Sequence, residues 1–346
     1  MMRRSYLMRA ACCALVAFLA LGVTWWQMER TQMLRGARFS IDRYIAGTAD
    51  RPFCYRVLAP TLLRILTPEL AKASNADPTR ALNACGLSVA AASKSPEACI
   101  ALAFILLASV SIYAAISGKI YRDFFSDSPH AACIGSVGAL LFLVPILRQG
   151  NGHIYDFSVL MFHAAMLFCI AQRRLRWYIV LFAVSCLNKE TTILMIFAYA
   201  ACLYDCIPRR RFIMYLVLQA AIFGLVYGAI HWYFQGNTGA TMETHLSQQM
   251  SKYLGIRAMG GIIAAGILVA YRWSEKPLVF RRAMFMLVPH LALWFWGAAP
   301  GETRNLYESA PLLALFSIRT VELATVHWAG RAFSGRFQGS KGRSGR

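Results

Sequence analysis

Residues 97–117 read EACIALAFILLASVSIYAAIS and contain no charged side chain after Glu97. As a helix rising about 1.5 Å per residue, this stretch spans the ~30 Å hydrocarbon core of a bilayer. Similar apolar runs, separated by basic clusters, recur through the whole chain of 346 residues. A soluble enzyme can contain one such run but not a series of them, so the sequence predicts an all-α protein with several membrane spans.

The overall composition supports the same class. Hydrophobic residues make up 58% of the chain and charged residues 15%, against about 25% charged residues in soluble domains. The formal net charge of +20 would suggest nucleic-acid binding in a soluble protein, but membrane proteins concentrate basic residues in cytoplasmic loops. No nucleic-acid partner is therefore expected. The sequence also contains no phosphate-binding loop, catalytic Ser–His–Asp pattern or zinc motif.

Ten apolar segments set the expected architecture. They lie near 7–27, 97–117, 131–147, 154–171, 177–187, 191–206, 212–233, 256–272, 283–298 and 307–325. With ten spans, all the short-loop basic clusters fall on one side, and the positive-inside rule places that side and both termini in the cytoplasm. We therefore expect about ten transmembrane helices in one membrane domain, 1–325, and a basic, disordered cytoplasmic tail, 326–346.

Region 177–206 admits two interpretations. Polar residues 188–190 interrupt its apolar pattern, so it forms either two short crossings joined by a turn or one long buried helix. The basic clusters at both of its ends favour the hairpin, because a single helix would place one cluster on the wrong side of the membrane.

The polar motifs that interrupt the apolar pattern all fall on the expected outer face. They are the long loop 28–96, RQGNGHIYD (148–156), NKET (188–191), the loop 234–255 and GETRN (301–305). The inner loops carry plain basic clusters, whereas these outer segments mix acidic, basic, amide and phenol groups. This asymmetry indicates a functional surface on the outer face.

The first outer loop, 28–96, contains three segments with helical apolar spacing. They are FSIDRYIAGTAD (39–50), FCYRVLAPTLLRIL (53–66) and TRALNACGLSVAAA (79–92), which we expect to be helices lying in the outer membrane interface. Pro52 suits a helix start, and Pro60 is expected to kink or reset the element. Cys54 and Cys85 could pair, although an ordinary solvated loop remains an alternative for the whole region.

The order of these motifs resembles the GT-C superfamily of membrane glycosyltransferases. It is similar, more narrowly, to bacterial members with an aspartate upstream of a PFRYRxLxP stretch. The matching residues are Asp42, Tyr44, Pro52, Phe53, Tyr55, Arg56, Leu58, Pro60, NKET (188–191), where relatives often carry NRET, and ETR (302–304). The chain departs from the pattern at Cys54, where relatives usually have Arg, and at Arg43, which follows Asp42.

The resemblance implies an all-helical fold and a sugar donor linked to polyprenyl phosphate. It also implies a multi-pass protein of the bacterial inner membrane with a periplasmic active face, in contact with membrane lipids. An aspartate in the first outer loop would take the acceptor proton or align the acceptor.

Glycosyl transfer needs a carboxylate to accept the acceptor proton and positive groups to stabilise the leaving phosphate. The carboxylate candidates are Asp42 first, then Asp50 and Asp156. The phosphate-binding candidates are Arg56, Lys189 and Arg304, and the sugar- or acceptor-binding candidates are Tyr44, Tyr55, Asn151, His153, Asp156, Glu190 and Glu302.

These candidates have structural alternatives. Asp42 could pair with Arg43, Asp50 could cap the turn before Pro52, and Lys189 could be neutralised by Glu190 within one interfacial turn. Ionisable residues inside an apolar stretch are nevertheless functional by default, which favours a role for the Lys189–Glu190 pair.

The residues leave three functions open. The first is an inverting glycosyltransferase, the second a transporter or flippase for an anionic or lipid-linked solute, and the third a non-catalytic scaffold. His153 and Asp156 could bind a divalent metal, but no third ligand is evident, so no cofactor is expected. A transporter should carry charges at mid-membrane with access from both sides, and the one-sided motifs favour the enzyme.

Overall fold

The computed structural model describes residues 2–30, 40–73, 77–84, 95–149, 152–240, 245–248, 256–297 and 303–340, and it is all-helical, with no strand in those ranges. The main helices are α1 (Met2–Arg30), α2 (Ile41–Ala46), α3 (Leu58–Ala73), α4 (Pro78–Ala84), α5 (Pro96–Ile120), α6 (Ala131–Gln149), α7 (Asp156–Ala171), α8 (Leu175–Cys186), α9 (Leu194–Leu203), α10 (Arg209–Tyr233), α12 (Ile256–Ala270), α13 (Leu278–Ala283), α14 (Leu287–Gly297) and α15 (Ala310–Ser340). Short 3₁₀ turns include η2 (Phe53–Tyr55), η5 (Glu190–Ile193) and η8 (Thr303–Leu306), and a π-helix, η4 (Tyr121–Phe125), follows α5.

The helices coincide with the apolar segments of the sequence. Among the described residues, five helical stretches are long and apolar enough to cross a membrane: Ala10–Glu29, Pro96–Phe125, Ala131–Arg148, Arg209–Tyr233 and Leu278–Gly297. Shorter apolar helices cover Asp156–Ala171, Leu175–Cys186 and Glu190–Leu203. The all-helical class is therefore confirmed, with several helices long and apolar enough to cross a membrane, whereas the count of ten spans and their topology stay predictions.

Region 177–206 is two antiparallel helices and not one long helix. Tyr178, near the start of α8, places its hydroxyl oxygen 3.0 Å from the Met195 carbonyl oxygen and stacks on Tyr199 of α9 with ring centroids 5.6 Å apart. Between the two helices, Lys189 has an extended backbone (φ −161°, ψ 142°), which ends the helical path.

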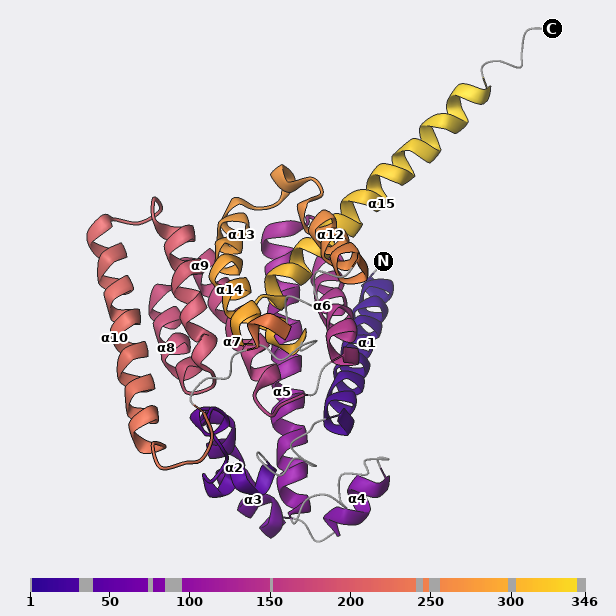
Figure 1. Cartoon of the computed structure of the whole chain (residues 1–346). Coiled ribbons are helices and arrows are strands. Elements are labelled where there is room, and N and C mark those ends of the chain that lie inside the picture. Colours follow the sequence, from indigo (N-terminus) through magenta and orange to yellow (C-terminus); the bar gives the residue numbers. More distant parts are fainter. Residues whose placement is uncertain are drawn as a thin grey trace, which may run out of the picture.

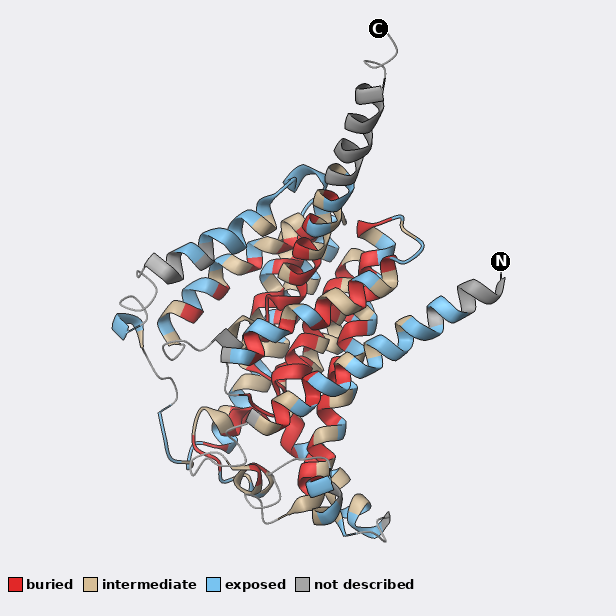
Figure 2. Ribbon diagram, turned by 90° about the vertical axis from the view of Figure 1, so that its right-hand side faces the viewer, coloured by how far each residue is buried: buried red, intermediate tan, exposed pale blue. Residues whose placement is uncertain are grey.

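The core is built around α5 and α7, whose residues are buried for most of their length (Figure 2). Helix α6 packs closely on α5 where two glycines meet. A Cβ added at Gly118 would lie 2.4 Å from the carbonyl oxygen of Ala132, and one at Gly135 would lie 3.0 Å from the Gly118 Cα. Small residues at such a crossing let two membrane helices approach closely, so larger side chains there would separate α5 from α6.

The outward surfaces of the helices carry large apolar side chains. Leu225 on α10 is 75% exposed and Phe18 on α1 is 72% exposed. Helix α10 stands at the edge of the bundle, with few buried positions along its length (Figures 1 and 2). Apolar surface of this extent on several helices is typical of a protein that faces lipid.

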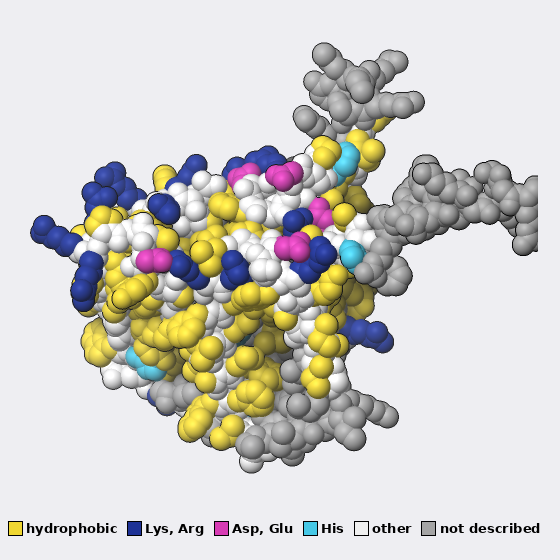
Figure 3. Space-filling model, turned by 90° about the horizontal axis from the view of Figure 1, so that it is seen from above, with side chains coloured by type: hydrophobic (Ala, Val, Ile, Leu, Met, Phe, Trp, Pro, Cys, Tyr) yellow, Lys and Arg dark blue, Asp and Glu magenta, His cyan; other side chains and the backbone are white. Residues whose placement is uncertain are grey.

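The loops separate into two groups at opposite ends of the bundle (Figure 1). The basic end comprises 126–130, 172–174, 204–208 and 271–277, and both chain termini lie on its side. Lys and Arg side chains gather on that face (Figure 3). The site end comprises 47–57, 152–155, 187–189, 234–240 and 303–309, next to α2, α3 and α4. The assignment of the basic end to the cytoplasm stays a prediction.

Two expectations concern the chain end and Pro60. Helix α15 continues to Ser340, and the disordered, cytoplasmic tail 326–346 stays a prediction. Residues 341–346 lie outside the described residues. Pro60 does not kink a helix, because α3 begins at Leu58 and places Pro60 in its first turn, where a missing N–H has no cost.

Candidate functional site

Helix α2 and its flanking turns bring the first outer loop to the bundle. Ser40 caps α2 by accepting a hydrogen bond from the Arg43 N–H (3.3 Å), and Gly47 ends it in the left-handed conformation (φ 74°). Tyr44 is buried on one side of α2, whereas Asp42 lies on a half-exposed side. The carboxylate favoured as the base is thus at the site end, on an accessible face of α2.

The loop that follows α10 is hydrogen-bonded to the loop that follows α2. The Asn237 side-chain amide donates to the carbonyl oxygens of Gly47 (3.0 Å) and Ala49 (2.9 Å), and the Thr238 hydroxyl donates to Asp50 Oδ1 (2.7 Å). Gly239 has φ 99°, and a Cβ there would lie 2.6 Å from the Arg51 carbonyl oxygen. This close approach holds the segment that leads into Arg56.

Asp50 has a structural role in the contact between these two loops. Besides Thr238, its Oδ1 lies 3.3 Å from Arg43 Nη2, and its main-chain carbonyl accepts from the Cys54 N–H at 3.2 Å. Arg43 therefore pairs with Asp50 and not with Asp42, the partner that the sequence alternative proposed. Asp50 is occupied as a loop anchor, which leaves Asp42 ahead of it as a candidate base.

Arg56 follows the η2 turn and reaches into the protein. Its side chain is 8% exposed and grips Glu190 with two nitrogens, Nη2–Oε1 at 2.7 Å and Nε–Oε2 at 3.4 Å. Nη1 also donates to the Tyr155 hydroxyl, and the guanidinium carbon lies 4.3 Å from the centroid of the Tyr155 ring. Arg56 thereby joins the first outer loop to the segments before α7 and α9.

Lys189 pairs with a residue that the sequence did not single out. Its Nζ lies 2.6 Å from Oε1 of Glu308, just before α15, and the two side chains are 5% and 0% exposed. Because Lys189 has an extended backbone, its side chain and that of Glu190 point to opposite sides of the chain. Lys189 and Glu190 consequently do not neutralise each other, and each has a partner from elsewhere in the fold.

The Tyr155 ring lies between the two ion pairs. Lys189 Nζ lies 5.8 Å from the ring centroid on which Arg56 also packs. Ser158 Oγ lies 2.7 Å from Asn188 Oδ1 and 2.8 Å from the Tyr155 carbonyl oxygen, and its one hydroxyl hydrogen can be donated to either; the contact with Asn188 ties the start of α7 to the turn before η5. Two cations from distant parts of the sequence therefore meet around one aromatic ring.

The segment before α7 is held by Asp156. Its Oδ2 accepts the His153 main-chain N–H at 2.7 Å and the Gln27 amide at 3.4 Å, which anchors the loop to α1. The His153 ring stacks between Phe53 and Tyr155, with centroid distances of 5.5 and 5.3 Å. These contacts give Asp156 and His153 a role in shaping the loop. No group of three or more His, Cys, Asp or Glu side chains that could hold a metal occurs in the described ranges.

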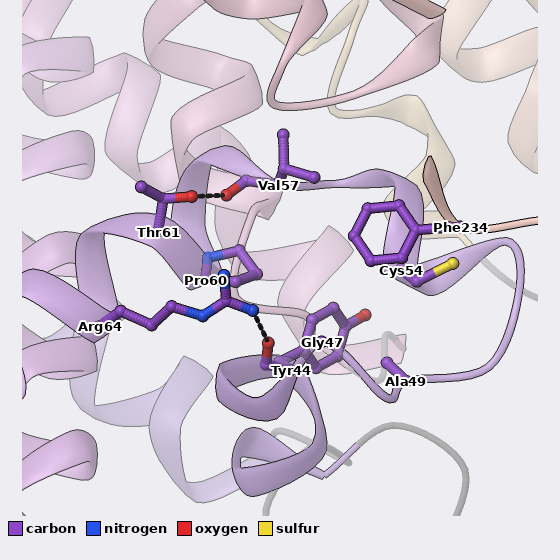
Figure 4. A pocket seen from close by; sticks show the side chains of 9 residues that line it. All are labelled: Tyr44, Gly47, Ala49, Cys54, Val57, Pro60, Thr61, Arg64 and Phe234. Carbon is purple, nitrogen blue, oxygen red and sulfur yellow. Dashed lines mark hydrogen bonds between the residues drawn. The ribbon is translucent and has the colours of Figure 1, made fainter. Parts of the chain in front are cut away.

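The remaining aromatic candidates lie beside α10 and α3. Tyr55 is buried and stacks on His231 of α10 at 4.0 Å. Tyr44 lines a hollow with Phe234, Pro60 and Arg64 (Figure 4). Arg64 donates to the carbonyl oxygens at the end of α2, at 2.5 Å to Ile45 and 3.5 Å to Tyr44, and a cation is favourable at a helix C-terminus. Arg64 is therefore a helix cap, and the hollow is small and mostly apolar.

Four predicted residues fall where the structure gives no side-chain position. Asn151, Glu302 and Cys85 lie outside the described residues, as does the side chain of Arg304. The Cys54 thiol is free and buried.

The electrostatics keep both ion pairs charged. Burial lowers the pKa of Arg56, but Glu190 and Tyr155 outweigh it and hold that pKa well above its ordinary value. Burial likewise lowers the pKa of Lys189, yet the Glu308 carboxylate outweighs it and raises that pKa above its ordinary value. The site therefore presents two fixed cations, each with a carboxylate that a bound anion must displace or share.

Sequence reasoning missed Glu308 and gave Gln27 no role. Glu308 falls inside the apolar segment 307–325, and an acidic residue within an apolar run is the signal that could have identified it. Gln27 ends the first apolar segment and carries no comparable signal.

Comparisons with known proteins add no relative. No protein-family model, curated protein or solved structure matches the chain.

Proposed function

We propose that this chain is an inverting membrane glycosyltransferase of the GT-C kind that takes a sugar from a polyprenyl-phosphate donor at the site end. The observation that carries the proposal is the meeting of Arg56 and Lys189 on the Tyr155 ring, with α2 and α3 beside them. Two buried cations that lie close together, in surroundings of low dielectric constant, are suited to bind a leaving phosphate. The negative charge of that phosphate grows in the transition state.

In this proposal the half-exposed Asp42 takes the proton of the acceptor hydroxyl. The acceptor oxygen then attacks the anomeric carbon, the bond from that carbon to the phosphate oxygen breaks, and the configuration inverts. Arg56 and Lys189 stabilise the phosphate that leaves, while Glu190 and Glu308 hold both cations in position before the donor binds. Sugar and acceptor contacts fall to Tyr44, Tyr55 and the His153 loop.

The proposal includes an orientation in which the site lies on the periplasmic face of a bacterial inner membrane. The position of the basic end, opposite the site end, supports this orientation through the positive-inside rule. Reporter fusions at Arg174 and Asn237 test it, since the two positions should report opposite sides of the membrane. The same side at both positions would refute the topology.

The test of the activity uses purified protein in lipid nanodiscs with radiolabelled polyprenyl-phosphate sugars. Asp42→Asn should abolish transfer while leaving the protein folded and inserted. Glu190→Gln is the matched variant, because Glu190 is the partly exposed carboxylate on Arg56. Loss of transfer in Glu190→Gln with full transfer in Asp42→Asn would remove Asp42 from the mechanism.

A transporter for an anionic or lipid-linked solute is the second candidate. It is favoured by the fully buried Lys189–Glu308 pair with His290 beside it, because paired ionisable residues inside membrane proteins mark ion and proton pathways. Counterflow of a labelled polyprenyl-phosphate sugar across proteoliposomes, without chemical change, would support the transporter and contradict the enzyme.

A further inference from the structure

Glu308 is the centre of a second polar cluster that touches the proposed phosphate site through Lys189. Its Oε1 lies 2.6 Å from Lys189 Nζ and accepts the Thr191 hydroxyl at 2.6 Å. Its other oxygen, Oε2, lies 3.5 Å from Nε2 of His290 on α14. One fully buried carboxylate thus has a lysine on one oxygen and an imidazole on the other.

The two histidines at this cluster each keep a free lone pair. Nε2 of His290 lies 2.6 Å from the Asn305 carbonyl, which only accepts, so Nε2 carries the hydrogen and Nδ1 is the lone pair. Nδ1 of His163 lies 3.0 Å from the Val159 carbonyl, so its Nε2 is the lone pair. Neither lone pair has a hydrogen-bond partner among the described residues, although both rings are buried.

Unpartnered buried polar atoms are uncommon and call for an explanation. Here the unpartnered atoms are imidazole nitrogens near the Glu308 carboxylate, whose charge is balanced by Lys189. If that lysine turns to a bound anion, Glu308 is left as an uncompensated charge in the interior, which is strongly unfavourable. The imidazole that already contacts Oε2 can restore the balance by taking a proton.

We propose that Glu308 exchanges Lys189 for a protonated His290 when Lys189 binds an anionic phosphate, so that anion binding takes up one proton. The proton comes from water and binds Nδ1 of His290, and no covalent bond breaks. Before binding, Lys189 and Glu308 are neutral as a pair. After binding, Lys189 pairs with the phosphate and Glu308 with the imidazolium. The inference rests on the proposed function, since it takes Lys189 as the phosphate ligand.

Other charges near the cluster do not remove the need for this proton. Arg56 and Asp156 lie within electrostatic range of Lys189, but Arg56 is held by two bonds to Glu190. His163 acts on Glu308 only from a distance, without a hydrogen bond between them. His290 is accordingly the described imidazole in direct contact with Glu308.

The experiment is isothermal titration of the full chain in nanodiscs with farnesyl phosphate, at one near-neutral pH in two buffers of different ionisation enthalpy. The dependence of the binding enthalpy on the buffer gives the number of protons taken up. The key variant is His290→Gln, because the Gln amide keeps an N–H near the position of Nε2 but cannot take a proton. The matched control is His163→Asn, whose amide keeps an N–H near Nδ1.

The wild-type chain and His163→Asn should take up about one proton more than His290→Gln on binding. The difference is the quantity compared, because the phosphate monoester itself titrates at a pKa of about 6. Equal uptake in wild type and His290→Gln, or loss of uptake only in His163→Asn, would overturn the inference while leaving the proposed function standing. Absence of farnesyl phosphate binding by the wild-type chain would overturn both.

A second measurement covers the case in which His290→Gln does not fold. Binding coupled to uptake of one proton weakens by about tenfold for each unit of rising pH, because the protonated state becomes scarcer. This pH series uses farnesyl sulfate, because a sulfate ester keeps a constant charge near neutral pH and the slope then comes only from the protein. A flat affinity for farnesyl sulfate near neutral pH would overturn the inference.

Discussion

The Lys189–Glu308 and Arg282–Asp205 ion pairs have nearly equal lengths but very different surroundings. At the site end, Lys189 Nζ and Glu308 Oε1 lie 2.6 Å apart, with side chains 5% and 0% exposed. At the basic end, Arg282 Nη2 and Asp205 Oδ2 lie 2.7 Å apart, with side chains 30% and 53% exposed. The contacts look alike, but water can replace a lost partner only at the basic end. Burial, and not distance, decides what each pair contributes.

The largest effect is expected at the site end. Glu308→Gln leaves Lys189 as a buried ammonium without a counter-ion, which should cost about 3–5 kcal/mol of stability. Detergent-solubilised protein followed by thermal unfolding would measure it.

The double variant Lys189→Met/Glu308→Gln is the control, because it removes both charges together. We expect it to recover much of the lost stability, since replacing a whole buried pair is often neutral. If Glu308→Gln were as stable as the wild type, burial would not determine how much this ion pair contributes to stability.

An intermediate loss of stability is expected for the Arg56–Glu190 pair, in which only the arginine side chain is buried. Glu190 is 29% exposed, so water can partly solvate Arg56 when the carboxylate is lost. Glu190→Gln should therefore cost about 1–3 kcal/mol, less than Glu308→Gln measured in the same unfolding assay. The reverse order of the two variants would show that exposure does not rank these pairs.

A neutral polar contact inside the bundle sharpens the comparison further. The Tyr178 hydroxyl donates to Gln219 Oε1 at 2.6 Å and joins α8 to α10, which is otherwise peripheral. Tyr178→Phe removes the donor and should cost about 1–2 kcal/mol, because the buried amide oxygen loses its partner. Adding Gln219→Leu to the Tyr178→Phe variant should then cost little more; a further large loss would point to packing and not hydrogen bonding.

The smallest effect is expected at the basic end. Asp205→Asn should leave the unfolding temperature at neutral pH unchanged within error, because the pair is exposed. Hydrogen bonds from Arg282 lower the pKa of Asp205 from 3.8 to about 2, so any contribution is present above pH 3.8 and lost as the pH falls towards 2. A wild-type advantage over Asp205→Asn that changed in size between pH 5 and 8 would contradict this assignment.

The site could be predicted from the sequence only in part. Arg56 and Lys189 were recognisable as cations in polar motifs that interrupt apolar segments, and the structure brings them together on Tyr155. Asp50 looked like a candidate base, but it anchors the loop through Thr238. A loop carboxylate looks the same in sequence whether it binds substrate or a neighbouring hydroxyl, so these roles could not be separated.

The sequence by itself determined the helices and their class. Apolar runs of sufficient length must form helices in a bilayer, where every main-chain polar group needs an internal partner. The break at 188–190 was also readable, because amide and charged side chains interrupt an apolar pattern there.

Only the tertiary structure decided which charges pair. Lys189 and Glu190 are adjacent in the sequence, but the extended backbone at Lys189 turns their side chains to opposite sides. Lys189 then finds Glu308 and Glu190 finds Arg56, both from distant segments. Local spacing fixes the direction in which a side chain leaves the backbone, whereas its partner depends on which helices pack around it.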